Sequence, residues 1–446
     1  MTPVPLDLPL RPSEAAELAN LVFDQAERKP LTDNVRNRIA SRGLGLRFET
    51  IRPYFGSLER DPVHPSAYYL AVDGGQGEPL LLHLAPSTAP TSSIFYKPLL
   101  IGRLRRANGP EMVINAIPFG PSDSDQVEKF CAHINTAFQP RPQGLRAAIT
   151  AGGDDPATAL PAALDAYRAI SKRTGKNLAS LGMAAGGAAR EFYAAAVWAT
   201  IRAGWREGYN SSLELDLSSE SLDAVKETVR QAPSFSTFGA EAGGLLHLQA
   251  DPRHPAAWGD GTVEEKFERL FPADERGWVF DEFVRSFDTG DAVYDIASGE
   301  VVRLAVKFGP ALRAVEQLQE SIRQTRSQRK AGRSFDFELL LERAGAPATP
   351  QELIFCLHWL KQRGRAAQLA APQLADGPDL ARQLKSLAGA AFSFQARLSI
   401  RARADHTPEV LNLIARATVG RVNYKLAGSA SDLAAHIPAV AAHFLG

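Results

Sequence analysis

The sequence predicts an α/β fold, a closed (β/α)8 TIM-type barrel preceded by an α+β domain, from three observations. From residue 144 onward, eight short segments alternate with segments of helical period, which is the repeat that a closed parallel barrel needs. These short segments are mostly apolar, as strands covered by helices should be. No glycine-rich dinucleotide fingerprint follows an early strand, which disfavours a doubly wound open sheet. We therefore expect the barrel over residues 144–446 and the α+β domain over residues 1–143.

The first domain is predicted to open with two helices and a hairpin. Helical periodicity places the helices at residues 13–29 and 32–43. Ser13 and Thr32 stand where N-caps are expected, because their hydroxyls can accept hydrogen bonds from the first free backbone N–H groups. Residues 67–86 alternate around a glycine-rich turn and predict a hairpin.

A strand, a turn and a helix are predicted next, within residues 111–138. The turn falls at residues 120–121, and Ser122 or Asp123 would cap the helix. The proline-containing segment 139–144 then marks the expected boundary with the barrel.

Eight strands and one long insert are predicted for the barrel. The strands are expected within residues 144–152, 177–183, 211–217, 234–241, 335–342, 366–373, 396–402 and 421–428. A helical insert, residues 243–333, separates the fourth strand from the fifth and far exceeds the usual connection. Amphipathic helices are expected in it at residues 262–271, 278–287 and 299–324. The insert is either a lid or packed scaffold, and we favour scaffold.

Composition restricts the partners and the compartment. Lysine plus arginine and aspartate plus glutamate number 50 each, so no global field attracts nucleic acid or an anionic membrane. The basic run at residues 323–333 lacks aromatic residues and ends a predicted helix, which favours a solvated helix end. Cys131 and Cys356 lie far apart in the sequence and lack the spacing of metal ligands, so neither a disulfide framework nor a zinc site is expected. The start of the chain lacks the pattern of a signal peptide, and no window reaches about 18 apolar residues. We expect a cytoplasmic protein.

Candidate catalytic residues stand at the predicted strand ends, where barrel enzymes place their chemistry. Asp216 shares a strand face with Glu214, so one carboxylate could act as a base while the other pairs with a cation. Glu338 falls inside the fifth strand, where a buried carboxylate needs an ion pair or a ligand role. Lys425 on the eighth strand is its expected partner. This lysine could hold a substrate carboxylate or carbonyl, or act as a base or Schiff-base nucleophile.

A second polar group follows the seventh strand and contains Arg401, Arg403, Asp405 and His406. The two arginines are candidates for substrate binding. His406 and His247 are the histidines nearest the barrel mouth, but neither belongs to an HxH or HExxH pattern. Asp405 and His406 are therefore the weak metal candidates, and no all-protein metal cage is predicted.

Gly428 and Ser429 precede a predicted helix after the eighth strand. Free backbone N–H groups at such a point favour an anion, either a phosphate or a sugar-acid carboxylate. The simpler alternative is ordinary capping by Ser431, with Asp432 in the first turn.

Several segments resemble the tagaturonate epimerase family, in order and roughly in spacing. They are "GWREGYNSSLELDL", "SFDFELLLERAGAPATPQELIFCLHWLKQRG", "ARLSIRARADH" and "GRVNYKLAGSASDLAAHI". The resemblance extends over about residues 204–436 and matches the insert poorly. It implies a metal-dependent barrel that epimerises keto-uronates and related ketoses. Glu338, Lys425 and Gly428 match the residue types of the family.

The departures from the family fall on its chemistry. Ser218 and Ser219 stand where the family has an aspartate and then a histidine. Arg343 replaces the second member of an acidic pair, and Arg401 replaces a histidine. The resemblance thus implies a divalent metal whose ligand positions are substituted here. A guanidinium keeps the positive charge and can bind carboxylates, but it is no Lewis acid, so Arg343 and Arg401 are expected to bind substrate.

Three functions are compatible with these residues. The first is a keto-uronate or ketose epimerase or isomerase of altered, metal-poor mechanism, with Asp216 or Glu338 as the base and Lys425 or Arg401 stabilising an enediolate. The second is a catalytically inactive relative that binds an anionic sugar or serves as a partner subunit. The third, ranked lower, is a lyase or aldolase with Lys425 as its reactive amine. The expected ligand is a small sugar or sugar acid, and an oligomer is compatible with the sequence.

Overall fold

The computed structural model divides the chain into two compact units. One unit comprises Met1–Gln139, Pro156–Asp165 and Arg190–Gly208, and the other comprises Pro140–Asp155, Ala166–Ala189 and Tyr209–Gly446. The residues that the structure describes are 10–26, 30–43, 45–89, 95, 98–105, 110–120, 123–153, 155–183, 188–232, 234–329 and 334–445.

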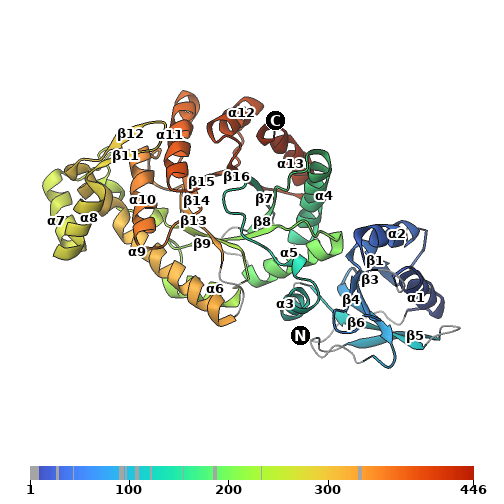
Figure 1. The fold of residues 1–446 in the computed structure, drawn as a ribbon. Coiled ribbons are helices and arrows are strands. Elements are labelled where there is room, and N and C mark those ends of the chain that lie inside the picture. Colours follow the sequence, from blue (N-terminus) through green and yellow to red (C-terminus); the bar gives the residue numbers. More distant parts are fainter. Residues whose placement is uncertain are drawn as a thin grey trace. The chain divides into compact units, whose positions relative to one another are not determined.

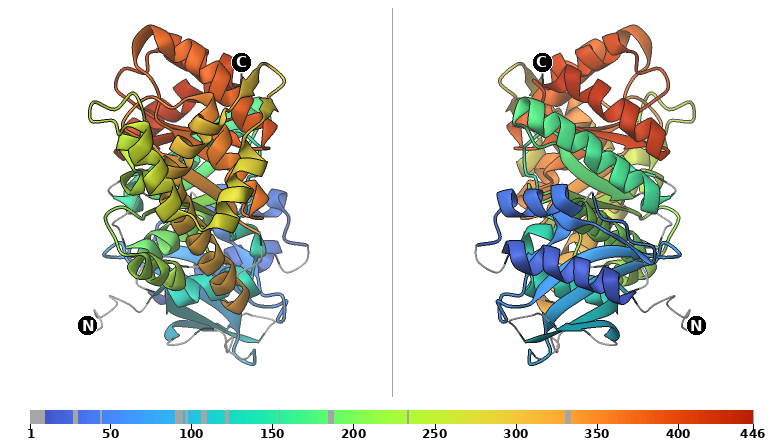
Figure 2. Two further views of the ribbon diagram at one scale, coloured as in Figure 1. Left: turned by 90° about the vertical axis from the view of Figure 1, so that its left-hand side faces the viewer. Right: turned by 90° about the vertical axis from the view of Figure 1, so that its right-hand side faces the viewer.

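The first unit is built on a six-stranded antiparallel sheet. Its strands are β1 (Ile51–Pro53), β2 (Glu59–Arg60), β3 (Tyr68–Gly74), β4 (Pro79–Pro86), β5 (Leu99–Arg105) and β6 (Glu111–Pro118). They pair in the order β1-β3-β4-β6-β5, with β2 beside β3 (Figure 1). Helices α1 (Pro12–Ala26) and α2 (Asp33–Gly43) cover one face, where Val22 and Phe23 share a core with Leu70 and Val72 (Figure 2).

The predicted hairpin and one of the two predicted caps are present. β3 and β4 pair antiparallel, as predicted. Thr32 precedes α2, and its hydroxyl oxygen accepts a hydrogen bond from the backbone N–H of Val35 at 3.4 Å. The cap predicted at Ser13 is wrong, because α1 already begins at Pro12, whose missing N–H suits the first helical position.

The helix predicted after the turn at residues 120–121 is α3 (Ser124–His133). Asp123 occupies its N-cap position, but the side chain makes no capping hydrogen bond. Pro121 and Ser122 lie outside the described residues.

The second unit contains a closed barrel of eight parallel strands, which confirms the closed α/β barrel predicted from the sequence. The strands are β7 (Ala148–Gly152), β8 (Ala179–Met183), β9 (Asn210–Asp216), β10 (Thr237–Glu241), β13 (Asp336–Leu341), β14 (Leu369–Pro372), β15 (Arg397–Arg401) and β16 (Val422–Ala427). They pair in chain order, and β16 closes on β7. Seven of the eight predicted segments contain their strand whole, and the third, residues 211–217, misses only Asn210 at the start of β9.

Helices follow the barrel strands along the chain. They are α4 (Pro156–Thr174), α5 (Ala189–Ala203), α6 (Leu222–Gln231), α10 (Pro350–Gln362), α11 (Leu380–Ser393), α12 (Pro408–Ala417) and α13 (Ala430–Phe444). The start of α10 is fixed by a capping box, in which Thr349 and Glu352 each accept a hydrogen bond from the backbone N–H of the other. None of the helices in the described ranges is long and apolar enough to cross a membrane.

The residues between β10 and β13 form a helical insert of their own. Its elements are η4 (Gly243–Leu245), η5 (Leu248–Ala250), α7 (Asp260–Leu270), α8 (Ala273–Phe283), the hairpin β11 (Ser286–Asp288) and β12 (Val293–Asp295), and α9 (Ser298–Arg329). Helix α9 packs against α6 and α10 in the outer layer of the barrel (Figure 1), and α7 and α8 pack against α9 (Figure 2). The long helix is therefore scaffold. The basic run at its end is not fully solvated, because Arg326 is buried and donates hydrogen bonds to the carbonyls of Phe235 and Ser334.

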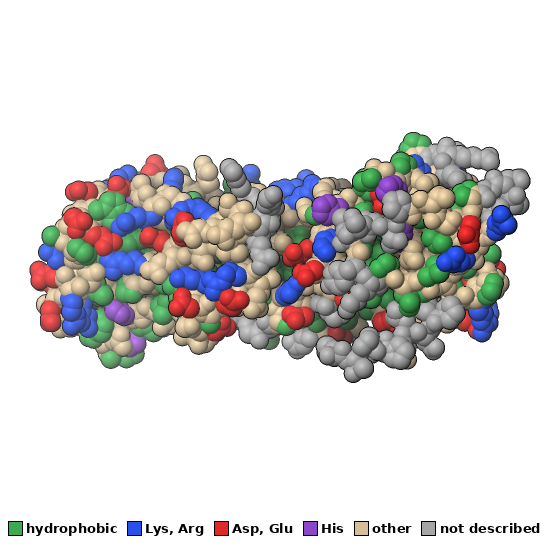
Figure 3. Space-filling model, turned by 90° about the horizontal axis from the view of Figure 1, so that it is seen from below, with side chains coloured by type: hydrophobic (Ala, Val, Ile, Leu, Met, Phe, Trp, Pro, Cys, Tyr) green, Lys and Arg blue, Asp and Glu red, His purple; other side chains and the backbone are tan. Residues whose placement is uncertain are grey.

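Charged side chains of both signs share the surface. On the face drawn in Figure 3, lysine and arginine side chains are interspersed with aspartate and glutamate side chains. Over the coloured part of that face, no large area carries a single sign, in agreement with the equal totals of acidic and basic residues.

Gly204 provides a stability test of the first unit. Its φ is +62°, and an added Cβ would meet the backbone carbonyl of Gly56. Gly208, with φ +83°, has nothing within 4 Å of such a Cβ. We expect Gly208→Ala to lower the free energy of unfolding by about 1–2 kcal/mol through backbone strain alone. Gly204→Ala should cost about 1–3 kcal/mol more because backbone must shift. Urea denaturation of both variants checks this, and equal losses would contradict it.

Candidate functional site

The candidate site is an ion network at the carboxyl ends of the barrel strands, centred on Lys425. Its Nζ lies 2.8 Å from Oε1 of Glu214 and 2.6 Å from Oε1 of Glu338. The three residues belong to β16, β9 and β13, which are not neighbours in the barrel, so their side chains meet across its interior. Glu338 is fully buried, and Lys425 and Glu214 are nearly so. The pairing of Lys425 with Glu338 is the one expected from the sequence.

Arg401 on β15 extends the network outward. Its Nη2 lies 3.0 Å from Oε2 of Glu214 and 3.1 Å from Oε2 of Glu342, which directly follows β13. The side chain of Arg401 is 43% exposed. Glu214 is thus the carboxylate that Lys425 and Arg401 share. The sequence could not decide whether Glu214 or Asp216 would take this role.

Small polar side chains line the barrel beside the network. Asn423, two residues before Lys425 and therefore on the same face of β16, accepts a hydrogen bond from Thr150 Oγ1 at 2.7 Å. It donates to Ser399 Oγ at 3.0 Å. These neutral contacts tie β16 to the strands on either side and fix the register that points Lys425 into the barrel.

The network keeps Lys425 and Glu214 charged. Burial alone would lower the pKa of Lys425, but the carboxylates of Glu338 and Glu214 outweigh it and raise that pKa above its usual value. Burial alone would raise the pKa of Glu214, but Lys425 and Arg401 outweigh it and hold that pKa below its usual value. Lys425 is therefore an ammonium at neutral pH, and Glu214 a carboxylate.

Asp216, expected as a base, is the last residue of β9 and is held by the backbone of the loop that follows. Its Oδ1 accepts hydrogen bonds from the backbone N–H groups of Ser218 at 2.7 Å and Ser219 at 3.1 Å. Its Oδ2 lies 3.5 Å from Nη1 of Arg343. Burial would raise the pKa of Asp216, but these N–H donors outweigh it and lower that pKa. A carboxylate stabilised in this way is a weak proton acceptor and a good anchor for Arg343.

Glu241, at the end of β10, was not singled out from the sequence. It shares a strand face with Gly239, where an added Cβ would lie near Glu338 and Glu214. Its Oε1 accepts a hydrogen bond from the backbone N–H of Gly243 at 2.7 Å. Burial raises the pKa of Glu241, so it is a stronger base than an exposed carboxylate. Its position as the last residue of a predicted barrel strand was the signal that could have identified it.

His406, Asp405 and Arg403 lie apart from the network. Nδ1 of His406 is 2.7 Å from the hydroxyl of Tyr424, which neighbours Lys425 in sequence and so points to the opposite face of β16. Arg403 pairs with Asp405 at 3.2 Å. Arg401, the last residue of β15, therefore contacts the network, whereas the other three residues belong to the loop that follows and have other partners.

Ser429 caps α13, so the capping predicted for Ser431 is wrong. The helix begins directly after Ser429, whose Oγ accepts a hydrogen bond from the N–H of Asp432 at 3.3 Å. Asp432 Oδ2 in turn accepts from the N–H of Ser429 at 3.0 Å. The N–H of Gly428 donates to the carbonyl of Gly152 at 3.1 Å. Anion binding at Gly428 and Ser429 stays a prediction.

The donor set at the barrel mouth does not fit the divalent metal that the family resemblance implies. Across the described ranges, no group of three or more His, Cys, Asp or Glu side chains is arranged to hold a metal ion. Glu214 and Glu342 are bridged by the guanidinium of Arg401, so a metal would have to displace a cation to reach their oxygens.

Comparison with solved structures supports the fold. Similar structures include the fructuronate-tagaturonate epimerase of Cohnella laeviribosi in complex with one glycerol, with a TM-score of 0.64 and 17% identity over 89% of this chain and 75% of that chain. The native form of that epimerase gives a TM-score of 0.62 and 18% identity over 88% of this chain and 74% of that chain. At such identity the likeness shows a shared fold. No protein-family model matches the sequence. A search of curated proteins finds no match either.

Proposed function

We propose that the barrel mouth binds a ketose or keto-uronate and transfers a proton at the carbon next to its carbonyl, so that the sugar is epimerised or isomerised. The observation that carries the proposal is that two cations, Lys425 and Arg401, share the carboxylate of Glu214 on β9. At the end of the neighbouring strand β10, Glu241 has a raised pKa. The fold shared with a fructuronate-tagaturonate epimerase supports the substrate class.

Substrate binding falls to the exposed arginines in this proposal. Arg401 and Arg343 are 43% and 62% exposed, so they can reach a sugar carboxylate or an oxyanion. A guanidinium can bind a carboxylate through two parallel hydrogen bonds. Lys425 lies deeper and keeps positive charge in the mouth. Together these cations would stabilise the negative charge that develops on the substrate oxygen.

Proton transfer falls to Glu241. Its carboxylate would remove the proton from the carbon beside the carbonyl, which leaves an enediolate. Return of that proton by Glu241 to the neighbouring carbon gives an isomer, whereas an epimer requires a proton delivered from solvent to the opposite face of the same carbon. Asp216 would position Arg343, and Glu338 would hold Lys425 in its charged form. Arg403, Gly428 and Ser429 stay as further candidates for substrate contact at the rim.

The second candidate function is sugar binding without turnover. Carboxylates of the protein already neutralise Lys425 and Arg401. Because of this, the two cations attract an incoming anion less strongly, which favours the second candidate. A lyase with Lys425 as the nucleophile is not favoured. A Schiff base needs the neutral amine, and the neighbouring carboxylates raise the pKa of Lys425.

Deuterium exchange tests the proposal. The protein is incubated in D2O with fructuronate, tagaturonate, fructose and tagatose, and incorporation at carbon is followed by NMR and mass spectrometry. We expect exchange with at least one sugar, reduced about 100-fold or more in Glu241→Gln, because a general base is worth about that factor. Glu268→Gln, an exposed change on α7, is the matched control and should leave exchange unaltered.

Three results would each contradict one part of the proposal. Absence of exchange across the four sugars would reject the enzymatic proposal, and calorimetric binding of one of them in the same samples would favour the second candidate. Full exchange by Glu241→Gln would reject the role of Glu241. Stoichiometric zinc, manganese or nickel in the purified protein would contradict the misfit between the mouth and a metal.

A further inference from the structure

A separate cavity lies in the insert, away from the residues of the ion network. It has a volume of 680 Å³ and is lined by α7, α8, the first turns of α9 and the start of α10. Cavities of about 300–1,000 Å³ are of the size that holds small organic ligands.

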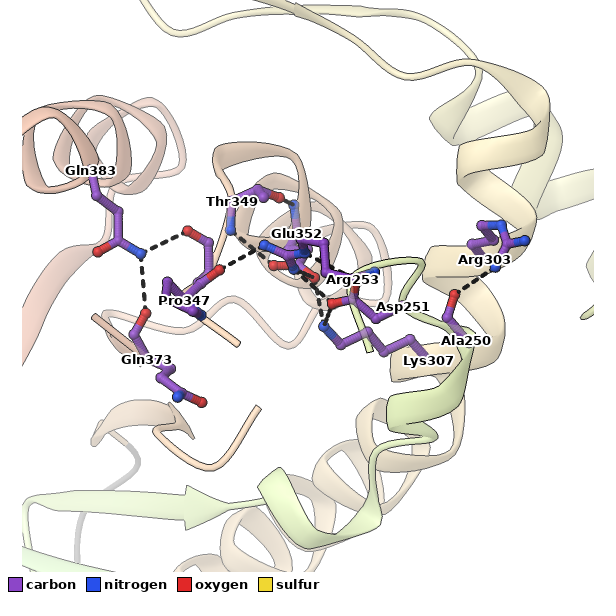
Figure 4. A network of polar contacts seen from close by, with 11 residues as sticks. Ala250, Asp251, Arg253, Arg303, Lys307, Pro347, Thr349, Glu352, Gln373 and Gln383 are labelled. Carbon is purple, nitrogen blue, oxygen red and sulfur yellow. Dashed lines mark hydrogen bonds and ion pairs between the residues drawn. The ribbon is translucent and has the colours of Figure 1, made fainter. Parts of the chain in front are cut away.

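Four charged residues at one side of this cavity neutralise each other. Lys307 Nζ lies 2.8 Å from Asp251 and 2.6 Å from Glu352, and Arg253 lies 2.7 Å and 2.8 Å from the same carboxylates. Figure 4 shows the four side chains converging between η5, α9 and α10. This quartet is two cations on two anions, so it leaves no net charge for a ligand.

A second ion pair in the lining is also neutral as a whole. Arg303 on α9 lies 2.5 Å from Asp260 at the start of α7 and also donates a hydrogen bond to the carbonyl of Ala250 (Figure 4). Glu264 and Glu300 are the remaining charged residues of the lining. No cation among the described residues forms an ion pair with either of them, so the cavity carries excess negative charge.

The two carboxylates without an ion pair among the described residues differ in burial, and that of Glu300 also accepts a backbone hydrogen bond from Ala297. Glu264 is exposed, whereas Glu300 is half-buried in the first turn of α9. Burial, with the nearby charge of Glu352, raises the pKa of Glu300. A carboxylate that is partly desolvated without a counter-ion gains most from a cation brought in by a ligand.

Most of the rest of the wall is apolar. Val263, Phe280, Val302 and Leu304 contribute to the lining. Phe280 keeps 36% of its surface exposed, although large hydrophobic side chains are usually covered. A ligand for this cavity therefore needs an apolar body as well as a positive charge.

We propose that the insert cavity binds a small organic amine, with its ammonium group on Glu300 and its apolar body against Phe280 and Val302. The site is independent of the barrel mouth and of the proposed sugar chemistry. It gives the long connection between β10 and β13 a ligand-binding role in addition to its packing.

Titration of the full-length protein with model amines tests the proposal. The probes are 2-phenylethylamine and hexylamine, with 2-phenylethanol and hexanol as uncharged isosteres and 3-phenylpropionate as an anion. Calorimetry or ligand-observed NMR should show saturable binding of an amine, at least about tenfold tighter than its alcohol, because a charge-assisted contact is lost in the alcohol. The anion should bind more weakly still.

Variants then locate the site. Glu300→Gln should weaken amine binding by about tenfold and bring the amine close to the alcohol. Glu264→Gln, the matched change at the exposed rim, should alter it by less than about threefold. Phe280→Ala, at a position 36% exposed, should weaken the amine and the alcohol alike. Circular dichroism confirms that each variant is folded.

Clear outcomes would overturn the proposal. They are a lack of saturable amine binding up to about 10 mM, equal affinity for an amine and its alcohol, or unchanged binding in both Glu300→Gln and Phe280→Ala. Loss of sugar exchange in a protein that still binds amines would leave this proposal standing and reject only the function proposed for the barrel mouth.

Discussion

Replacing Lys425 with methionine is expected to lower the free energy of unfolding by about 3–5 kcal/mol. The change keeps most of the side-chain volume and removes the charge that neutralises Glu214 and Glu338. Most of the lost stability should come from Glu338, because its charge is fully buried. Within the described residues, neither of its oxygens has a hydrogen bond of regular geometry. Chemical denaturation followed by circular dichroism measures the loss.

Two comparisons isolate the cause of that loss. Lys385→Met, at an exposed position on α11, should change stability by less than about 0.5 kcal/mol. Adding Glu338→Gln to Lys425→Met should restore part of the stability, since the buried charge is then gone and Glu214 keeps Arg401. A loss of less than about 1 kcal/mol in Lys425→Met would contradict the prediction.

The pH dependence gives an independent reading of the same pair. The pKa of Lys425 is raised above its usual 10.5, so its ion pairs stabilise the folded state fully below that pH. That contribution is lost as the pH rises through the higher pKa of the folded state. The stability gap between wild type and Lys425→Met should therefore narrow above pH 10.5, and a constant gap would argue against a stabilising ammonium.

Replacing Lys307 with methionine should cost a similar amount, about 3–5 kcal/mol, in a different part of the second unit. Lys307 is 2% exposed and lies between Asp251 and Glu352, which are themselves nearly buried. Its removal leaves two carboxylates sharing one partly exposed arginine. Because α9 packs against α6 and α10, the loss should appear in the cooperative unfolding of the barrel.

Arg253→Met is the matched comparison for Lys307. Arg253 contacts the same two carboxylates, but 40% of its side chain is exposed. When Arg253 is removed, water can therefore solvate the two carboxylates in part. We expect its removal to cost about 1 kcal/mol. Denaturation of both variants under the same conditions decides the matter, and equal losses would show that burial of Lys307 does not set its contribution.

The barrel was predictable because its signal is local. Each strand is a short apolar run between segments of helical period, and covering both faces of a strand with protein produces that pattern in any barrel. Cap positions were less predictable. Ser13 and Ser431 have the right chemistry, but the helices begin at Pro12 and directly after Ser429, and in each case a neighbouring residue suited the helix start better.

The candidate site was predictable only in part. Lys425 and Glu338 could be paired because each sits inside a predicted strand, where a lone charge must find a partner. Glu214 and Asp216 could not be ranked, since they share a strand face and differ only in depth. The backbone N–H groups of the loop after β9 engage Asp216, and this leaves Glu214 to bridge the two cations.

The sequence by itself determined the residue types and their strands: a lysine, an arginine and several carboxylates at the ends of β9, β13, β15 and β16. Only the tertiary structure decided which charges neutralise each other and which remain for a ligand. The physical reason is that electrostatic pairing and burial depend on distances across a closed barrel, between residues more than a hundred positions apart in the chain, as with Glu214 and Lys425. The same holds for the insert, where packing closes the quartet around Lys307 and leaves Glu300 without a cation among the described residues.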